Sequence, residues 1–260
     1  AALSYPMNMS QYDWGYKAEP EHNLNGRSIV CPRGKVVGGS SSINGMIYVR
    51  GNPGDYNYWA QNGAVGWDYK DVLPYFQRME TSNCSQAHFR GTEGPLPVSR
   101  GKRENPLHEA FVKASQQAGY SATEDYNGFR QEGFGPADMT VWKGSRYSTA
   151  KAYLKPALKK KNVQLLKRAL VDQIIFEGKK AIGVKFIYQG ETRIIKVKKD
   201  IVLSAGSINS PAILQRSGIG DGEELKSIGV SVLNHLPGVG KNLQDHLEVY
   251  FQVKCLQPIT

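Results

Sequence analysis

The sequence predicts an α/β fold of the α+β kind, in which helices precede a β meander. Segments rich in β-branched residues and separated by glycine turns fill residues 163–205, a pattern typical of consecutive strands. Earlier segments, residues 69–78 and 106–118, carry apolar side chains at helical spacing. An apolar strand at residues 200–206 then runs directly into a helix start, so we expect the meander to attach to a larger sheet.

The composition is that of a globular protein. The 260 residues are 40% apolar and 10% aromatic, enough for a core in one large or two modest domains. The formal charge of +10 alone would fit nucleic acid or an anionic membrane. Because the cations are densest at residues 151–168 and 179–199, where they resemble solvated faces, nucleic acid is not expected as a partner. An anionic membrane surface or an anionic cofactor stays open.

Cysteine usage fits a reducing compartment. Cys31, Cys84 and Cys255 are odd in number and widely spaced, and no Cys-x-x-Cys pair occurs, so no metal site is expected. No apolar run approaches the roughly 18 residues that a membrane-spanning helix needs.

The first elements are expected to be short. Residues 28–31 can pair as a strand after a polar, irregular beginning. Asp55 is placed to cap a short helix that carries Tyr56, Tyr58 and Trp59.

Two longer helices should follow. The helix over residues 69–78 is expected to bury one face made of Val72, Tyr75, Phe76 and Met79. Residues 81–106 are a long loop with one extended piece at 96–98. The next helix runs over residues 106–118, ends at Gly119, and has an apolar face made of Leu107, Ala110, Phe111 and Ala114.

The second half begins with an aromatic, glycine-rich loop at residues 126–136, and a long loop in a compact domain is more often functional than idle. Ser148 and Thr149 are expected to cap the next helix, and a further helix starts at Ser210. Between these helices the predicted strands are residues 163–166, 170–176, 181–188, 192–197 and 201–203.

Two glycine-rich stretches carry the functional signal. Residues 33–51 contain five glycines, three consecutive serines and an asparagine, so the backbone can bend around a partner and offer it N–H groups and hydroxyls. Such a segment suits a phosphate or a flavin edge, although an ordinary Gly/Ser loop has the same composition. Residues 206–220 form the second stretch, where a helix N-terminus follows a strand and can face an anionic ligand.

Together, in this order, the two stretches resemble the paired signatures of the glucose-methanol-choline (GMC) family of FAD-dependent alcohol oxidoreductases. The resemblance implies a Rossmann-like FAD-binding domain interrupted by a substrate domain built on an antiparallel sheet. It assigns residues 1–69 and 159–246 to the FAD-binding domain, and residues 70–158 and 247–260 to the substrate domain. No strand followed by Gly-x-Gly-x-x-Gly occurs, so the FAD-binding domain is expected to be incomplete, without its first βαβ unit, and the chain an internal piece of a longer protein.

The resemblance also implies which residues hold the cofactor. Val37 would lie against the flavin, Val171 would hold the adenine edge through its backbone, and the contacts to the ring and the ribityl-phosphate region would come from Asn44, Gly45, Met46 and Ile47. Some members carry a histidine bonded covalently to the flavin just before that asparagine. Here the position is Ile43, so non-covalent FAD is expected.

The implied reaction is the oxidation of a primary alcohol, in which a base takes the hydroxyl proton while a hydride moves to flavin N5. The family's catalytic histidine lies in a C-terminal region that this chain does not contain, so no catalytic residue is assigned and the fragment alone is expected to be inactive. His246 is the nearest candidate, but in the family its run abuts the cofactor domain without being the base.

Residues 67–69, 127–135 and 236–246 most resemble family members that oxidise choline to betaine aldehyde. This implies choline as substrate, held by aromatic faces and a carboxylate, and a quinone or other electron acceptor. It also implies a mitochondrial location at the matrix side of the inner membrane, or otherwise the cytoplasm, with peripheral membrane association left open. The alternatives are a family member acting on a sugar, a polyol or another alcohol, and a non-catalytic module that keeps the flavin-domain shell.

Overall fold

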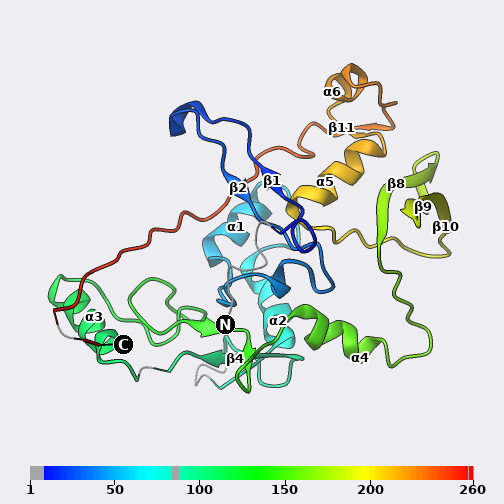
Figure 1. Cartoon of the computed structure of the whole chain (residues 1–260). Coiled ribbons are helices and arrows are strands. Elements are labelled where there is room, and N and C mark those ends of the chain that lie inside the picture. The colour runs from blue at the N-terminus through cyan, green and yellow to red at the C-terminus, as the bar shows by residue number, and fades with distance from the viewer. Residues whose placement is uncertain (1–8, 84–87, 103, 257, 260) are drawn as a thin grey trace. The chain divides into compact units, whose positions relative to one another are not determined.

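A computed structural model describes residues 9–83, 88–102, 104–256 and 258–259 (Figure 1). The chain divides into two compact units, one of Ala1–Leu165 with Thr260 and one of Leu166–Ile259. Both helices and strands are present, as the predicted fold class requires. Cys84 lies outside the described residues.

The first unit opens with a two-stranded antiparallel ribbon of β1 (Tyr16–Lys17) and β2 (Val30–Cys31), joined through a 3-10 turn, η1 (His22–Leu24). This confirms the predicted strand for its last two residues. The glycine-rich stretch follows and contains a second 3-10 turn, η2 (Gly39–Ser42).

The helix α1 (Pro53–Gln61) begins two residues before the predicted cap. Asn52, not Asp55, caps it, since the Asn52 side chain accepts a hydrogen bond from Gly54 N at 2.8 Å. Asp55 lies in the first turn, where a carboxylate is still favoured by the helix dipole. The predicted cap was therefore wrong, because Pro53 starts the helix earlier.

The helix α2 (Tyr69–Met79) is where the sequence predicts it, with Asp68 as its cap. Its apolar face is not a buried face, however. Tyr75 and Met79 are exposed, and Val72 and Phe76 are half-buried. The aromatic cover of Phe76 comes from Tyr56 of α1, whose ring centroid lies 5.7 Å away, and so only part of the α2 surface is covered.

The same correction applies to α3 (Pro106–Gln117), which lies at the predicted place. Its predicted apolar face is exposed, with Phe111 63% accessible, and among its residues only Ser115 is buried. Phe111 contacts Phe134 edge to face at 5.4 Å, so the aromatic loop covers one end of this face and leaves Leu107 at the surface.

A small mixed sheet forms the centre of the first unit. It contains β3 (Glu80–Ser82), β4 (Leu96–Arg100) and β5 (Asp138–Met139) in that order, with β3 and β4 parallel and β4 and β5 antiparallel. The extended piece predicted at residues 96–98 is thus confirmed as a strand. The hairpin of β6 (Val141–Trp142) and β7 (Ser145–Arg146) follows. The apolar core against this sheet consists of Tyr48, Leu96, Val98 and Ala152.

The helix expected after Ser148 and Thr149 is present as a π-helical turn, η3 (Ala150–Leu154), that continues into α4 (Lys155–Ala157). Neither predicted residue caps it through a side chain. The Thr149 hydroxyl donates instead to Gly38 O at 3.1 Å, which ties this helix to the glycine-rich stretch.

The second unit contains the predicted meander, with β8 (Ala169–Glu177), β9 (Lys180–Tyr188) and β10 (Glu191–Lys196) antiparallel and in the order β10-β9-β8 (Figure 1). Gln189 and Gly190, with φ of 53° and 82°, form the tight β9–β10 turn. The strands predicted at residues 163–166 and 201–203 are absent. Val202 is 85% exposed, and no described segment pairs with these residues, so their backbone groups have no ladder to join.

The helix α5 (Gly206–Arg216) begins four residues before the predicted start. Ser210 lies inside it, and its hydroxyl accepts a hydrogen bond from Ala205 N at 3.0 Å. β11 (Ile219–Gly220) pairs in parallel with β12 (Asn234–His235), and α6 (Gly222–Ser227) lies between them in sequence. Within the described ranges, no helix is both long and apolar enough to cross a bilayer.

Candidate cofactor-binding loop

Residues 33–51 fold into a loop in which the backbone closely approaches itself. A Cβ on Gly34 would lie 2.4 Å from Gly39 O, so only glycine fits there. Gly38 has a φ of 94°, and a Cβ on it would lie 2.5 Å from Ser42 Oγ. These glycines set the path of the loop before Asn44 is reached.

The three serines hold this path from within. Ser40 Oγ accepts a hydrogen bond from Gly34 N at 3.1 Å, and Ser42 Oγ donates to Val37 O at 2.9 Å. Ser41 Oγ donates to Gly38 O at 2.6 Å and accepts from Thr149 N at 3.0 Å. These serine hydroxyls, which were expected to bind a partner, therefore bind the loop's own backbone and the start of η3.

Asn44 is the best-anchored of the predicted cofactor residues. Its side-chain oxygen accepts hydrogen bonds from Met46 N at 3.1 Å and from Arg146 Nη1 at 2.8 Å. Arg146 Nη1 also donates to Asn44 O at 2.7 Å and to Ser41 O at 3.2 Å. Partial burial lowers the pKa of Arg146 from its ordinary value. Nothing in the sequence indicated this residue.

After a turn at Met46, where φ is 65°, the burial of the side chains alternates along residues 46–50. Met46, Tyr48 and Arg50 are buried, and Ile47 and Val49 are exposed. Of the predicted cofactor contacts, Val37 is 44% and Ile47 is 50% exposed, Asn44 and Gly45 are partly buried, and Met46 is buried. The loop thus exposes the apolar side chains of Val37, Ile47 and Val49, which are suited to pack against a planar ring.

Hydrogen bonds from neighbouring segments hold residues 46–50 in place. Tyr48 N donates to Asp138 O and Thr140 N to Met46 O, both at 2.8 Å. Asn127 accepts from Arg50 N at 2.8 Å through its side-chain oxygen and donates to Tyr48 O at 3.0 Å through its amide. Asn127 comes from the aromatic, glycine-rich loop, so that loop supports the strip.

A buried cluster of charges lies behind the strip. The Arg90 guanidinium contacts Glu80 at 2.7 Å, Asp125 at 2.7 Å and Asp138 at 2.8 Å. Arg50 reaches Glu80 at 2.9 Å. Burial by itself lowers the pKa of Arg90, but the carboxylates of Glu80, Asp138 and Asp125 outweigh burial and raise it above its ordinary value. This cluster could not be predicted from the sequence, because its members come from separate segments and share no spacing.

Val171 lies in the second unit, on β8, opposite Phe186 of β9. The strand register shifts between Val171 and Gln173, and the Val171 carbonyl accepts a hydrogen bond from Arg216 Nη2 at 3.4 Å. β8 is at the edge of its sheet, and the backbone groups next to Val171 bind residues of the same unit, since Asp172 O accepts from Arg216 Nε at 2.9 Å. The contact of Val171 with a cofactor stays a prediction.

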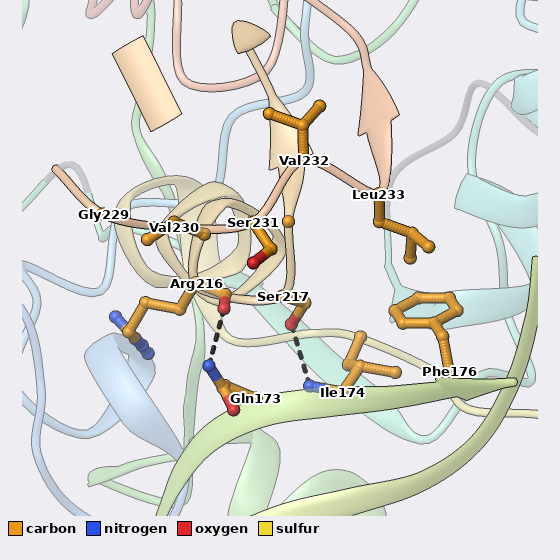
Figure 2. Close-up of a pocket in the computed structure, with 11 residues that line it drawn as sticks. Gln173, Ile174, Phe176, Arg216, Ser217, Gly229, Val230, Ser231, Val232 and Leu233 are labelled. Carbon is orange, nitrogen blue, oxygen red and sulfur yellow. Dashed lines mark hydrogen bonds between the residues drawn. The ribbon is translucent and has the colours of Figure 1, made fainter. Parts of the chain in front are cut away.

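A cavity of about 490 Å³ lies in the second unit between β8, the end of α5 and residues 229–233 (Figure 2). Two hydrogen bonds join its walls, Gln173 Nε2 to Arg216 O at 2.7 Å and Ile174 N to Ser217 Oγ at 2.8 Å. Phe176 and Leu233 give it an apolar end (Figure 2). Val171 does not line it.

In the described part of the chain, no three His, Cys, Asp or Glu side chains are grouped so as to hold a metal ion. His246 is exposed, and its backbone N–H binds the Asp245 side chain.

The profile of the GMC oxidoreductase family matches residues 10–248 of this sequence. The chain belongs to the GMC oxidoreductase family. Family membership implies FAD as the cofactor.

Curated relatives cover the whole of this GMC chain. The oxygen-dependent choline dehydrogenase of Brucella anthropi is 56% identical over 260 residues, and that of Rhizobium rhizogenes is 53% identical. This chain spans 47% of each, so it spans about half the length of the curated relatives it matches. The expected mitochondrial location was wrong, because these relatives are bacterial proteins.

Solved structures agree with the family and the fold. Pyridoxine 4-oxidase from Mesorbium loti is 33% identical with a TM-score of 0.87, over 94% of this chain and 48% of that one. An FAD-dependent oxidoreductase from Chaetomium thermophilum is 32% identical with a TM-score of 0.81, over 90% and 43% of the respective chains. These similarities confirm the predicted fold class.

Replacing Arg90 with Met should strongly destabilise the first unit. Three buried carboxylates would lose their shared cation, and breaking a buried pair costs about 3–5 kcal/mol. Urea unfolding followed by circular dichroism measures this loss. The matched control is Lys113→Met, which removes an exposed partner of Glu109 and should change the midpoint little. Equal, small effects of both substitutions would contradict the central role of the cluster.

Two buried tyrosines should make the chain less stable at alkaline pH. Burial, with the nearby Glu80 carboxylate, raises the pKa of Tyr48 to about 12, and burial raises that of Tyr126 to about 12. Unfolded tyrosine ionises near pH 10, so unfolding releases protons above that pH. Their contribution is complete below about pH 10 and is lost as the pH rises toward 12.

The free energy of unfolding, measured between pH 8 and 11.5, should therefore fall more steeply for the unsubstituted chain than for a variant that combines Tyr48→Phe with Tyr126→Phe. Exposed Tyr58 and Tyr120, both replaced by Phe, provide the control, which should keep the steep slope. Parallel slopes for all three proteins would refute the assignment.

Proposed function

We propose that the whole protein to which this chain belongs oxidises choline to betaine aldehyde with FAD, a step that leads toward glycine betaine. The observation that carries the proposal is the loop of residues 33–51, whose exposed apolar strip lies within the family match, taken with relatives that are named choline dehydrogenases. FAD, when bound, accepts the hydride from the alcohol carbon. The catalytic base is assigned to a part of the protein outside this sequence.

The chain's own contribution is to hold the cofactor. Val37 and Ile47 would pack against the ring, Asn44 and Gly45 would offer polar and backbone contacts, and Met46 would support the strip from behind. Val171, on the edge strand β8, would bind the adenine edge through its backbone. The residues fit this task, because cofactor sites combine apolar side chains with a few polar groups that fix the orientation.

We assign residues 1–69 and 159–246 to the FAD-binding domain, and residues 70–158 and 247–260 to the substrate domain. The first compact unit ends at Leu165, close to the proposed junction between residues 158 and 159, and this supports that junction.

We propose that the FAD is dissociable. Ile43, at the position of the covalent histidine in some members, is 4% exposed and has no nucleophilic atom. Its side chain packs in the loop and can form no bond to the ring.

A second candidate is oxidation of another alcohol. Structural relatives with high TM-scores are named pyridoxine 4-oxidase and formate oxidase, so the shared fold accommodates several substrates. We propose a quinone or another oxidant as the electron acceptor. Because the relatives are named oxygen-dependent, dioxygen should be tested as well.

A chimera tests these proposals. This chain should replace the matching stretch of the Brucella anthropi relative, whose own enzyme is the control. Anaerobic choline should bleach the flavin absorbance of the chimera, and glucose and pyridoxine should not. Acid precipitation should leave the flavin in the supernatant. Absence of bleaching by choline, with the parent enzyme active, would reject the choline assignment, and a yellow pellet would reject dissociable FAD.

We also propose peripheral association with an anionic membrane, on the basis of charge. Residues 139–165 contain seven Lys or Arg and no Asp or Glu. No carboxylate of the described residues pairs with the exposed ammonium groups at 155 and 159–161, and Tyr153 and Leu158 are exposed beside them. Such a mixture of lysines and apolar side chains fits an anionic bilayer surface.

Replacing Lys159, Lys160 and Lys161 with Gln should lower binding to phosphatidylglycerol vesicles by roughly 100-fold, at about a factor of five per lysine. Cosedimentation measures the binding. The control, Gln at Lys179, Lys180 and Lys198, removes the same charge elsewhere. Equal losses in both variants would show that only bulk charge matters.

A further inference from the structure

Arg146 is a half-buried cation without an acidic partner. Among the described residues no carboxylate pairs with it, and partial burial alone accounts for its lowered pKa. Most other arginines in the first unit's interior, such as Arg50 and Arg90, are paired with carboxylates. A half-buried guanidinium is costly unless its donors are used, so its contacts indicate its purpose.

Among the described residues, the hydrogen bonds of the Arg146 guanidinium converge on the turn before residues 46–50. Nη1 donates to Ser41 O, Asn44 O and Asn44 Oδ1, at 3.2, 2.7 and 2.8 Å. Two of these acceptors belong to Asn44. Charge-assisted bonds of this length are stronger than neutral ones, so Arg146 fixes both the backbone and the amide of Asn44.

The position of Arg146 is itself fixed. It ends the β6–β7 hairpin, where it pairs with Val141, and its carbonyl accepts a hydrogen bond from Lys151 Nζ at 2.7 Å. Thr149, three residues further along the chain, donates a hydrogen bond to Gly38 O of the same loop. The hairpin and η3 therefore hold the loop from one side.

Asn44 passes this constraint on to Met46. The Asn44 side-chain oxygen that accepts from Arg146 also accepts from Met46 N at 3.1 Å, and Met46 has a φ of 65°. A non-glycine residue takes this left-handed conformation only where its surroundings impose it. The turn of Met46 sets the direction of the strip that carries Ile47.

We propose that Arg146 is a positioning residue for the flavin, acting through Asn44 and Met46. The inference rests on the proposed function, in which residues 44–47 contact FAD. Arg146 orients the amide of Asn44 and holds the Met46 turn, and its uncompensated positive charge favours an electron-rich or anionic group beside the loop.

The test uses the flavin-loaded chimera with Arg146→Met, Arg146→Lys, Asn44→Ala and the Arg146→Met/Asn44→Ala double variant. Flavin fluorescence gives the dissociation constant of FAD, and the absorbance bands of bound flavin report its surroundings. Arg193→Met, at an exposed arginine of β10, is the matched control.

Arg146→Met should raise the dissociation constant by about 10- to 100-fold, in line with the loss of charge-assisted hydrogen bonds. Arg146→Lys should recover part of this loss, because it keeps the charge but has fewer directed donors. The double variant should bind within about threefold of the weaker single variant, since both substitutions break one chain of contacts. The flavin bands should shift in Arg146→Met and not in Arg193→Met.

Additive effects of the two substitutions, or an Arg146→Met protein that binds FAD as tightly as Arg193→Met, would overturn the positioning role and leave the proposed function intact. A chimera that binds no FAD before any substitution would overturn both. If Arg146→Met fails to fold, judged by its urea midpoint, Arg146→Lys and Asn44→Ala decide the question. Unchanged FAD affinity and unchanged bands in those two variants would count against the role.

Discussion

The sharing of one guanidinium by three buried carboxylates is the constraint on which the first unit depends. Glu80 ends α2 and starts β3, Asp125 precedes the aromatic loop, and Asp138 starts β5, so Arg90 joins three segments that are distant in sequence. In a low-dielectric interior these charges are tolerated only together. Around them, Asn127 and Tyr126 connect the cluster to the backbone of Tyr48. Residues 46–50 are therefore supported by the buried cluster of charges rather than by a large apolar core.

The glycine-rich loop is fixed from both ends by different chemistry. Upstream of Asn44, serine hydroxyls and close backbone approaches determine its path. Downstream of Asn44, the buried cluster of charges and β5 determine the path of the loop. Asn44 lies where the two halves meet, and Arg146 reaches it from a hairpin of the same unit. A rigid loop of this kind suits the binding of a large planar cofactor, since little flexibility has to be lost on binding.

Local pattern was sufficient to predict much of the fold. The helices α2 and α3 and the three strands of the meander follow from residue spacing and glycine turns. The sequence pattern gave wrong predictions where strand pairing or side-chain burial depends on other segments. Examples are the strand predicted at residues 201–203 and the apolar face of α3. The starts of α1 and α5 were misplaced, because Asp55 is as good a capping residue as Asn52 and Ser210 is a better one than Ala205. For the site, the sequence pattern indicated the glycine-rich loop, but not Arg90 or Arg146, whose contacts with Asp125 and Asn44 span 35 and 102 residues.

The meander of the second unit has two edges, and each is shielded from pairing with a strand of another molecule in its own way. On β8 the register shifts twice, between Val171 and Gln173 and between Ile175 and Phe176, and these irregularities spoil the flat template that a foreign strand would need. On β10 the exposed charged side chains of Glu191, Arg193 and Lys196 would lose water if another strand covered them, which is unfavourable. Both features disfavour pairing with a strand of another molecule, although β8 and β10 each have a strand partner on one side only.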